Sequence, residues 1–211
     1  MLEAREAGTE DPEFLLGVLE ALTGGFNLLP LLGKLRHSDD PRVRSKLAAM
    51  LGKTARAHEW FDALRADPDP RVRANAIESL WAAEGSFAET CFQDALEDSH
   101  HRVVANALVG MYQQGKVESI RLLAELSRHP EARFRVAAAW AMGRTGDGRF
   151  VPLLRSMRRQ IGDTPAVLKN CLQSISRITH GVAAAKRRAA AIRVLEAGAA
   201  LRPDGEVWEF A

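Results

Sequence analysis

The sequence predicts an all-α fold in which pairs of helices stack into an elongated array. A motif recurs about every 30 residues, and apolar residues follow each copy at the spacing of one helix face. The composition agrees, because Ala, Leu and Arg abound, aromatic residues make up only 6%, and runs of β-branched residues bounded by turns are missing. At 211 residues and 46% hydrophobic, the chain has ample material for a buried core.

The recurring motif predicts where helices begin. Asp40-Pro41-Arg42-Val43-Arg44 returns 29 residues later as Asp69-Pro70-Arg71-Val72-Arg73. Weaker copies follow at His100-His101-Arg102-Val103-Val104 and Glu131-Ala132-Arg133-Phe134-Arg135, and Thr164-Pro165-Ala166-Val167-Leu168 keeps the proline but not the arginines. Proline is well tolerated in the first turn of a helix, and the Asp or Thr before it can cap the exposed amides.

Each start is followed by one apolar stripe of a helix, at the positions four and eight beyond the Val or Phe. The stripe residues are Leu47 and Leu51, Ala76 and Leu80, Ala107 and Met111, Ala138 and Met142, and Cys171 and Ile175. Between these helices lie second amphipathic stretches, at 28–35, 58–64, 87–96, 117–126 and 150–161. A unit of about 30 residues with two helices cannot bury both apolar faces alone, so neighbouring units must stack into a continuous core.

The motif Asp-Pro-x-Val-Arg, followed by an Ala- and Leu-rich helix, resembles HEAT repeats, especially the short bacterial variety found also in phycobilisome lyases. The resemblance covers about residues 12–180. It implies that the first helix of each pair lies outside and the second lines the concave face. The predicted fold is a right-handed α-solenoid of about five stacked HEAT-like helical hairpins with half-repeats at both ends. We expect one domain over 1–211, with a repeat core at about 12–180, a C-terminal helix at 182–201 and a tail at 202–211.

Both ends of the array look like half-repeats. Pro12 lies 29 residues before Pro41, and the segment 11–22 has the layout of a second helix without its first. The segment 182–201 looks like a first helix with no partner after it. Two explanations stay open: these helices cap the array, or the sequence is cut from a longer chain. The segment 206–210, which includes Trp208 and Phe210, has no assignable role in a repeat.

The sequence contains no convincing catalytic constellation, so we expect no enzyme, no metal and no cofactor. The best metal candidate is His100-His101 with Asp98, but this pair occupies the capping position of its repeat. The glycine-rich segment 143–148 follows a helix rather than a strand, which indicates a helix end instead of a phosphate loop. Cys91 and Cys171 lie in apolar helical patterns and are interpreted as buried thiols. The repeated arginines are interpreted as partners of acidic residues in their own turns.

Positions two, six and nine beyond each Val or Phe should face away from the core and towards solvent on the concave side. In the middle repeats these positions hold five apolar or aromatic residues, namely Trp81, Val109, Tyr112, Val136 and Trp140. We call these five residues the inner strip. An apolar strip on a groove is typical of a surface that binds a partner helix or an extended peptide. The alternative is that Trp81 and Trp140 fill gaps between stacked repeats.

Charge is distributed unevenly along the chain. Residues 149–193 contain ten Lys or Arg and one acidic residue, although the whole chain carries only +2. Such a segment can attract nucleic acid, anionic lipid or an acidic protein, or can be an ordinary solvated helix face. The candidate anion or nucleic-acid contacts are Arg155, Arg158, Arg159, Lys186, Arg187 and Arg188.

The favoured function is therefore a non-enzymatic scaffold that binds a protein partner. Two alternatives are a nucleic-acid-binding protein similar to the alkylpurine DNA glycosylases, and a subunit similar to the lyases that attach bilins. The second rests only on the type of repeat, and a fold does not carry a function. No apolar run approaches the length of a membrane span and the N-terminus lacks the features of a signal peptide, so we expect a cytoplasmic protein.

Overall fold

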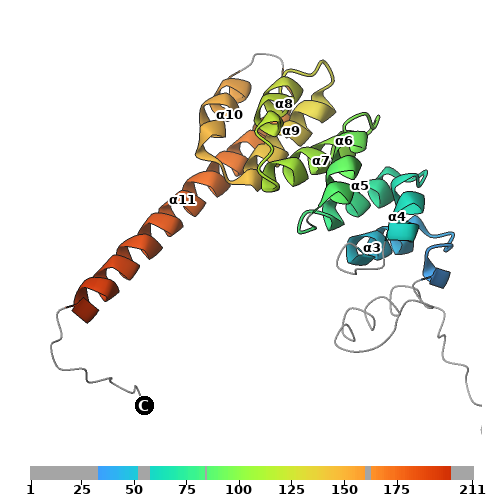
Figure 1. Ribbon diagram of the computed structural model, residues 1–211. Helices are drawn as coiled ribbons and strands as arrows, with labels where there is room; N and C mark the ends of the chain where they lie inside the picture. Colours follow the sequence, from blue (N-terminus) through green and yellow to red (C-terminus); the bar gives the residue numbers. More distant parts are fainter. Residues whose placement is uncertain (1–32, 52–57, 84, 160–162, 201–211) are drawn as a thin grey trace, which may run out of the picture.

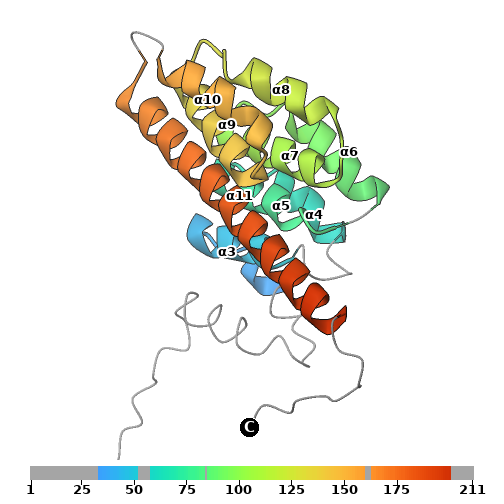
Figure 2. The same cartoon turned by 90° about the vertical axis from the view of Figure 1, so that its left-hand side faces the viewer.

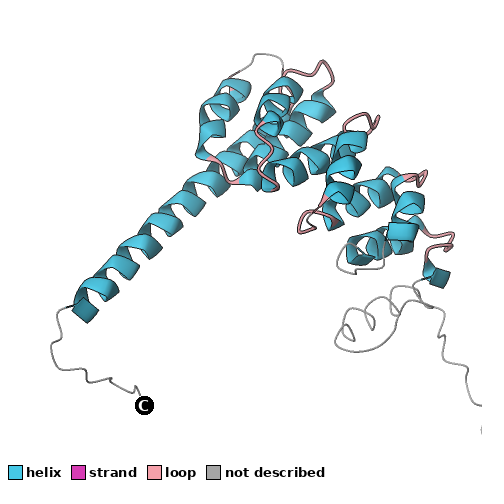
Figure 3. Cartoon of the chain, in the orientation of Figure 1, coloured by secondary structure: helices cyan, strands magenta, loops and turns pink. Residues whose placement is uncertain are grey.

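The computed structural model describes residues 33–51, 58–83, 85–159 and 163–200. In this part of the chain the backbone forms helices joined by turns and contains no strand (Figure 3). The predicted all-α fold is thus confirmed. The expected half-repeat at 11–22 and the tail at 202–211 lie outside the described residues.

The helices form two layers (Figures 1 and 2). The inner helices each begin at a copy of the motif: α3 (Pro41–Leu51), α5 (Pro70–Ser79), α7 (His101–Gln113), α9 (Ala132–Thr145) and α11 (Pro165–Ala200). The outer helices are α4 (His58–Arg65), α6 (Ser86–Ala95), α8 (Glu118–Leu126) and α10 (Val151–Arg158), the last preceded by a short 3₁₀ turn at Gly148–Phe150. Each inner helix packs on the next, and each outer helix packs on the inner helix that follows it. This arrangement is the predicted solenoid of stacked helical hairpins.

The motif starts these helices by the expected mechanism. The Asp40 carboxylate accepts a hydrogen bond from the Arg42 backbone N–H at 2.8 Å, and Asp69 does the same for Arg71. At α7 the ring of His100 takes the place of the carboxylate and accepts from the backbone N–H of Arg102 at 3.3 Å. The cap is therefore preserved in the third copy even though its residue type has changed.

The core runs along the whole array, between the two layers. The Val or Phe of every motif copy is buried, as are the residues four positions beyond it. Cys91 and Cys171 are buried free thiols, as predicted, and burial raises the pKa of each to about 11. One continuous core agrees with a repeat stack in which each unit is stabilised by its neighbours.

The C-terminal helix differs from the prediction. We expected a separate helix at 182–201, but α11 continues without a break from Pro165 through Gly181 to Ala200. A single glycine costs only about 1 kcal/mol in a helix interior, which is too little to end a helix in an Ala- and Arg-rich segment. Beyond Ile178 the described side chains of α11 are exposed, and this half of the helix stands apart from the other helices (Figure 1). No helix of the described part is long and apolar enough to span a membrane.

Candidate binding surface on the inner helices

The structure places the inner strip on α7, α9 and the turn after α5, but not all of it faces solvent. Val109 of α7 is fully buried, which contradicts its expected exposure, and the other four residues are partly buried. Every residue of α7 from 103 to 111 is buried. An inner helix is covered by its outer partner and by an inner helix on each side, so its open face is narrower than a helical projection suggests.

Two tryptophans meet across α7. Trp81 follows the end of α5 and Trp140 lies on α9, yet their ring centroids are 6.3 Å apart. The indole N–H of Trp81 donates to the backbone carbonyl of Asn106 on α7 at 2.8 Å. The guanidinium of Arg144 lies 5.0 Å from the Trp81 ring centroid and 6.0 Å from that of Trp140, within the range of cation–π attraction. Trp81 therefore fills space between repeats, as the alternative interpretation proposed.

Tyr112 is also engaged within the chain. Its hydroxyl donates to the Asp147 carboxylate at 3.0 Å, and Asp147 is paired with Arg149 at 2.6 Å. Burial and the neighbouring Asp147 carboxylate raise the pKa of Tyr112 above its ordinary value. The hydroxyl thus ties α7 to the turn before α10.

The remaining two strip residues, Val136 and Trp140, line a cavity of about 320 Å³ between α7, α9 and α11. With Ala105 of α7 they form an apolar wall, and no outer helix contributes to the lining. The polar lining includes His101 and Arg102 at the start of α7 and Asn170 of α11. These three residues were missed by sequence reasoning. The available signal was the replacement of Asp-Pro by His100-His101 at the capping position.

Two polar groups at this cavity are not satisfied within the described part of the chain. The Nδ1 atom of His101 is buried and has no hydrogen-bond partner there. Burial, together with the neighbouring His100, Arg133 and Arg102, holds the pKa of His101 below its ordinary value, so the ring is neutral near pH 7. The Arg102 side chain is exposed and pairs with no carboxylate among the described residues. The start of α7 therefore offers unused hydrogen-bonding capacity next to an apolar wall.

Three other arginines of the motif are used structurally. Arg44 pairs with Asp67 at 2.7 Å, Arg73 with Asp98 at 2.7 Å, and Arg135 with Asp163 at 2.6 Å. We call Arg44, Arg73 and Arg135 the ladder arginines, since each binds the aspartate in the turn before the next inner helix. Their predicted pairing with acidic residues is confirmed, but the partner lies in the turn of the next repeat and not in the arginine's own turn. In the third copy Val104 replaces the arginine and His129 stands where the next aspartate would be.

The six basic candidates of the C-terminal third are not gathered into one site. Arg155 and Arg158 lie on α10 and Arg159 follows it, whereas Lys186, Arg187 and Arg188 lie on the projecting half of α11. On α11, Lys186 lies 21 residues beyond Pro165, which is about 30 Å at 1.5 Å per residue. All six side chains are exposed, and none forms an ion pair within the described ranges.

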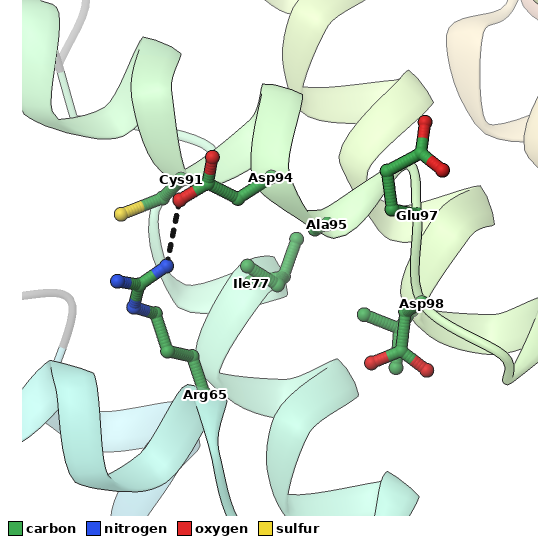
Figure 4. A pocket seen from close by; sticks show the side chains of 8 residues that line it. Arg65, Ile77, Cys91, Asp94, Ala95, Glu97 and Asp98 are labelled. Atoms are coloured by element: carbon green, nitrogen blue, oxygen red, sulfur yellow. Dashed lines mark hydrogen bonds and ion pairs between the residues drawn. The ribbon is translucent and has the colours of Figure 1, made fainter.

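A second, smaller cavity of about 190 Å³ lies between α4, α5, α6 and the start of α7. Arg65 reaches across it to Asp94 at 2.7 Å, and Cys91 lies beside this pair (Figure 4). Because burial raises the pKa of Cys91 to about 11, its thiol stays protonated and is a poor nucleophile. Among the residues that the structure describes, no three His, Cys, Asp or Glu side chains are grouped so as to hold a metal ion.

Two layers of stacked helical hairpins with a continuous core define an α-solenoid built from helical repeats. Residues 57–132 match a family model described as HEAT repeats. The predicted resemblance to HEAT repeats is thereby confirmed. No curated protein matches the chain. HEAT repeats commonly mediate protein–protein interactions, and all-helical folds of this kind are typically non-catalytic.

Proposed function

We propose that this chain is a non-enzymatic protein-interaction scaffold that binds a helix or an extended peptide on the concave face of its inner helices. The observation that carries the proposal is the cavity between α7, α9 and α11, with its apolar wall of Val136, Trp140 and Ala105. A volume of about 320 Å³ suits one or two side chains of a partner better than a large cofactor. Partly exposed tryptophans are frequent anchors at protein interfaces.

Nucleic-acid binding is the second candidate function. It is favoured by the exposed, unpaired basic residues Arg155, Arg158, Arg159 and Lys186–Arg188 among those described. Their separation into two groups counts against it, and so does the packing of Trp81 on Trp140, because single-stranded binding uses open aromatic platforms. We found no feature that favours a bilin-lyase-like activity beyond the type of repeat.

The proposal is tested by selecting ligands from a random peptide library displayed on phage. Val136→Glu places a charge in the cavity and Trp140→Ala removes part of its wall. Val117→Glu is the matched control, because it makes the same change at a valine that is 77% exposed beside outer helix α8. Selected peptides should bind the wild type and the control within about twofold, and both cavity variants at least about tenfold more weakly.

Thermal unfolding of each variant shows whether weaker binding comes from the altered cavity or from loss of the folded structure. The comparison is made only for variants whose melting temperature lies within a few degrees of the wild type. If folded Val136→Glu and Trp140→Ala bound every selected peptide as the wild type does, the cavity would not be the binding surface.

A further inference from the structure

The cavity lies at a repeat that departs from the common motif at its helix start. The inner helices α3 and α5 begin with Asp-Pro, but α7 begins with His100-His101. At two other inner helices the acid at the N-cap position lies near the arginine two residues further on: Asp69 is 3.7 Å from Arg71, and Glu131 is 2.7 Å from Arg133. At α7 the cap is a histidine, so Arg102 lacks this neighbour. The nearby Asp98 is already bound by Arg73 at 2.7 Å and by the backbone N–H of His100 at 2.8 Å.

Three groups that favour an anion therefore meet at the start of α7. The Arg102 guanidinium carries a charge that no described carboxylate neutralises. The His101 ring is partly exposed and lines the cavity, and a neutral imidazole can donate one hydrogen bond. The positive end of the α7 helix dipole adds to the field. Both side chains line the cavity whose wall is Val136 and Trp140.

The positive charge at the start of α7 is part of a wider difference in charge between the inner and outer helices. The inner helices α3, α5, α7 and α9, with residues 165–180 of α11, contain eleven Lys or Arg and one acidic residue, Glu78. Three of these bases are the ladder arginines and are used internally. The outer helices α4, α6, α8 and α10 contain six acidic residues and four arginines. The inner helices are thus strongly basic and the outer helices weakly acidic, a difference that favours an acidic partner on the inner side.

We propose that the partner of this surface is an acidic peptide segment. An apolar side chain of the segment enters the cavity against Val136 and Trp140, and a neighbouring Asp or Glu carboxylate accepts hydrogen bonds from Arg102 and the His101 ring. This inference rests on the proposed function and names the chemistry of its partner.

A peptide fits these observations better than a nucleic acid does. The apolar wall of the cavity offers nothing to a phosphate backbone, whereas it can hold an aliphatic or aromatic side chain. Asp69 and Glu131 occupy the N-cap positions of α5 and α9, the inner helices on either side of α7 in the stack. A continuous polyanion would meet these carboxylates, but a peptide can place its charge at Arg102 alone.

The test uses peptides selected on the full chain, each paired with a synthetic form in which Asp and Glu are changed to Asn and Gln. Binding is measured by fluorescence anisotropy to the wild type and to two variants. Arg102→Glu reverses the charge, and the double variant His100→Asp with His101→Pro restores the start found at α3 and α5. The control is Arg128→Glu, an exposed arginine in the turn after outer helix α8.

We expect the selected peptides to be rich in Asp or Glu next to an apolar residue. The amide forms should bind the wild type at least about tenfold more weakly than the acidic peptides do. The acidic peptides should lose at least as much affinity for Arg102→Glu and for the double histidine variant. Arg128→Glu should bind within about twofold of the wild type. The double variant should fold at least as well as the wild type, because Asp and Pro are preferred at these two positions.

The possible failures are distinguishable. If selected peptides lose affinity in Val136→Glu but bind equally well in their amide forms, the acidic partner is wrong and the scaffold proposal stands. If selection yields no peptide that depends on the cavity, both proposals are overturned. The last measurement uses labelled single-stranded and duplex oligonucleotides. If these bound in a manner that depends on Arg102 and no peptide bound, the partner would be a nucleic acid and not an acidic peptide.

Discussion

At the scale of single residues, each ladder arginine joins three parts of the chain through one guanidinium group. Arg73 binds Asp98 through two nitrogen atoms at 2.7 and 2.9 Å, and a third nitrogen donates to the carbonyls of Asp67 and Pro68 in its own turn. Asp98 in turn accepts from the backbone N–H of His100. A change at one of these side chains therefore affects two turns and the start of a neighbouring helix.

We expect Asp98→Ala to lower the free energy of unfolding by about 2–3 kcal/mol, because it leaves two nitrogen atoms of a mostly buried guanidinium and one backbone N–H without partners. Burial alone would raise the pKa of Asp98, but hydrogen bonds from Arg73 and from the His100 backbone keep it below its ordinary value. The control is Asp94→Ala, since Asp94 is 54% exposed in its pair with Arg65. The control should cost less than about 1 kcal/mol. Urea unfolding measures both, and equal losses would contradict a structural role for the ladder.

At the scale of elements, the sequence predicted where the inner helices begin better than it predicted what covers them. The starts depend on local chemistry, namely a cap and a proline, and these act within a few residues. The burial of Val109 depends on the helices packed around α7, which come before and after it in the chain. A projection of one helix contains no information about such neighbours. For the same reason, His101 and Arg102 could not be placed at a cavity from the sequence alone.

Gly110 and Gly181 both lie within helices, but only Gly110 is closely packed against another residue. A Cβ atom added to Gly110 of α7 would lie 2.3–2.7 Å from ring atoms of Phe92, which is fully buried on α6. A Cβ atom added to Gly181 of α11 would meet no described atom within 4 Å. Gly110 thus allows the close approach of α6 and α7, whereas Gly181 serves no packing purpose in the described structure.

Alanine substitutions at these two positions should therefore have opposite effects. Gly110→Ala is expected to destabilise the protein by about 1–3 kcal/mol through overpacking, despite its better helix propensity. Gly181→Ala is expected to stabilise α11 by about 0.5–1 kcal/mol. Chemical denaturation gives the first value, and the helical signal in circular dichroism reports the second. A stabilising Gly110→Ala would show that the helices are not packed as closely as described.

At the scale of the whole molecule, the stack behaves as a line of units in which each contacts its neighbours. The repeat period made the fold predictable, because the helix-start motif and its apolar stripe recur in each repeat. The candidate binding surface lies where one repeat differs from the others. The same repeat also interrupts the series of ion pairs made by the ladder arginines. Ion pairs join the turns of successive repeats at Arg44, Arg73 and Arg135, but within the described residues none joins the repeat of α7 to that of α9.

The interruption can be repaired if Val104 and His129 are the structural counterparts of Arg73 and Asp98. His129 supports this equivalence, because its ring nitrogen accepts from the backbone N–H of Glu131 as Asp98 accepts from that of His100. Val104→Arg alone should cost about 3 kcal/mol or more, since Val104 is only 6% exposed and the new charge would be unpaired. His129→Asp alone should cost about 1 kcal/mol through loss of the ring contact with Phe134, whose centroid is 4.1 Å away.

The double variant should be more stable than the sum of these losses, by a coupling energy of about 2–3 kcal/mol, because the new pair can form across the interface of the two repeats. Urea unfolding of the wild type, both single variants and the double variant completes the cycle. Arg73→Val combined with Asp98→His makes the reverse exchange in the preceding repeat and should show a coupling of the same sign. Additive losses at Val104 and His129 would mean that the array joins these two repeats differently from the others, so that its units could not be treated as equivalent.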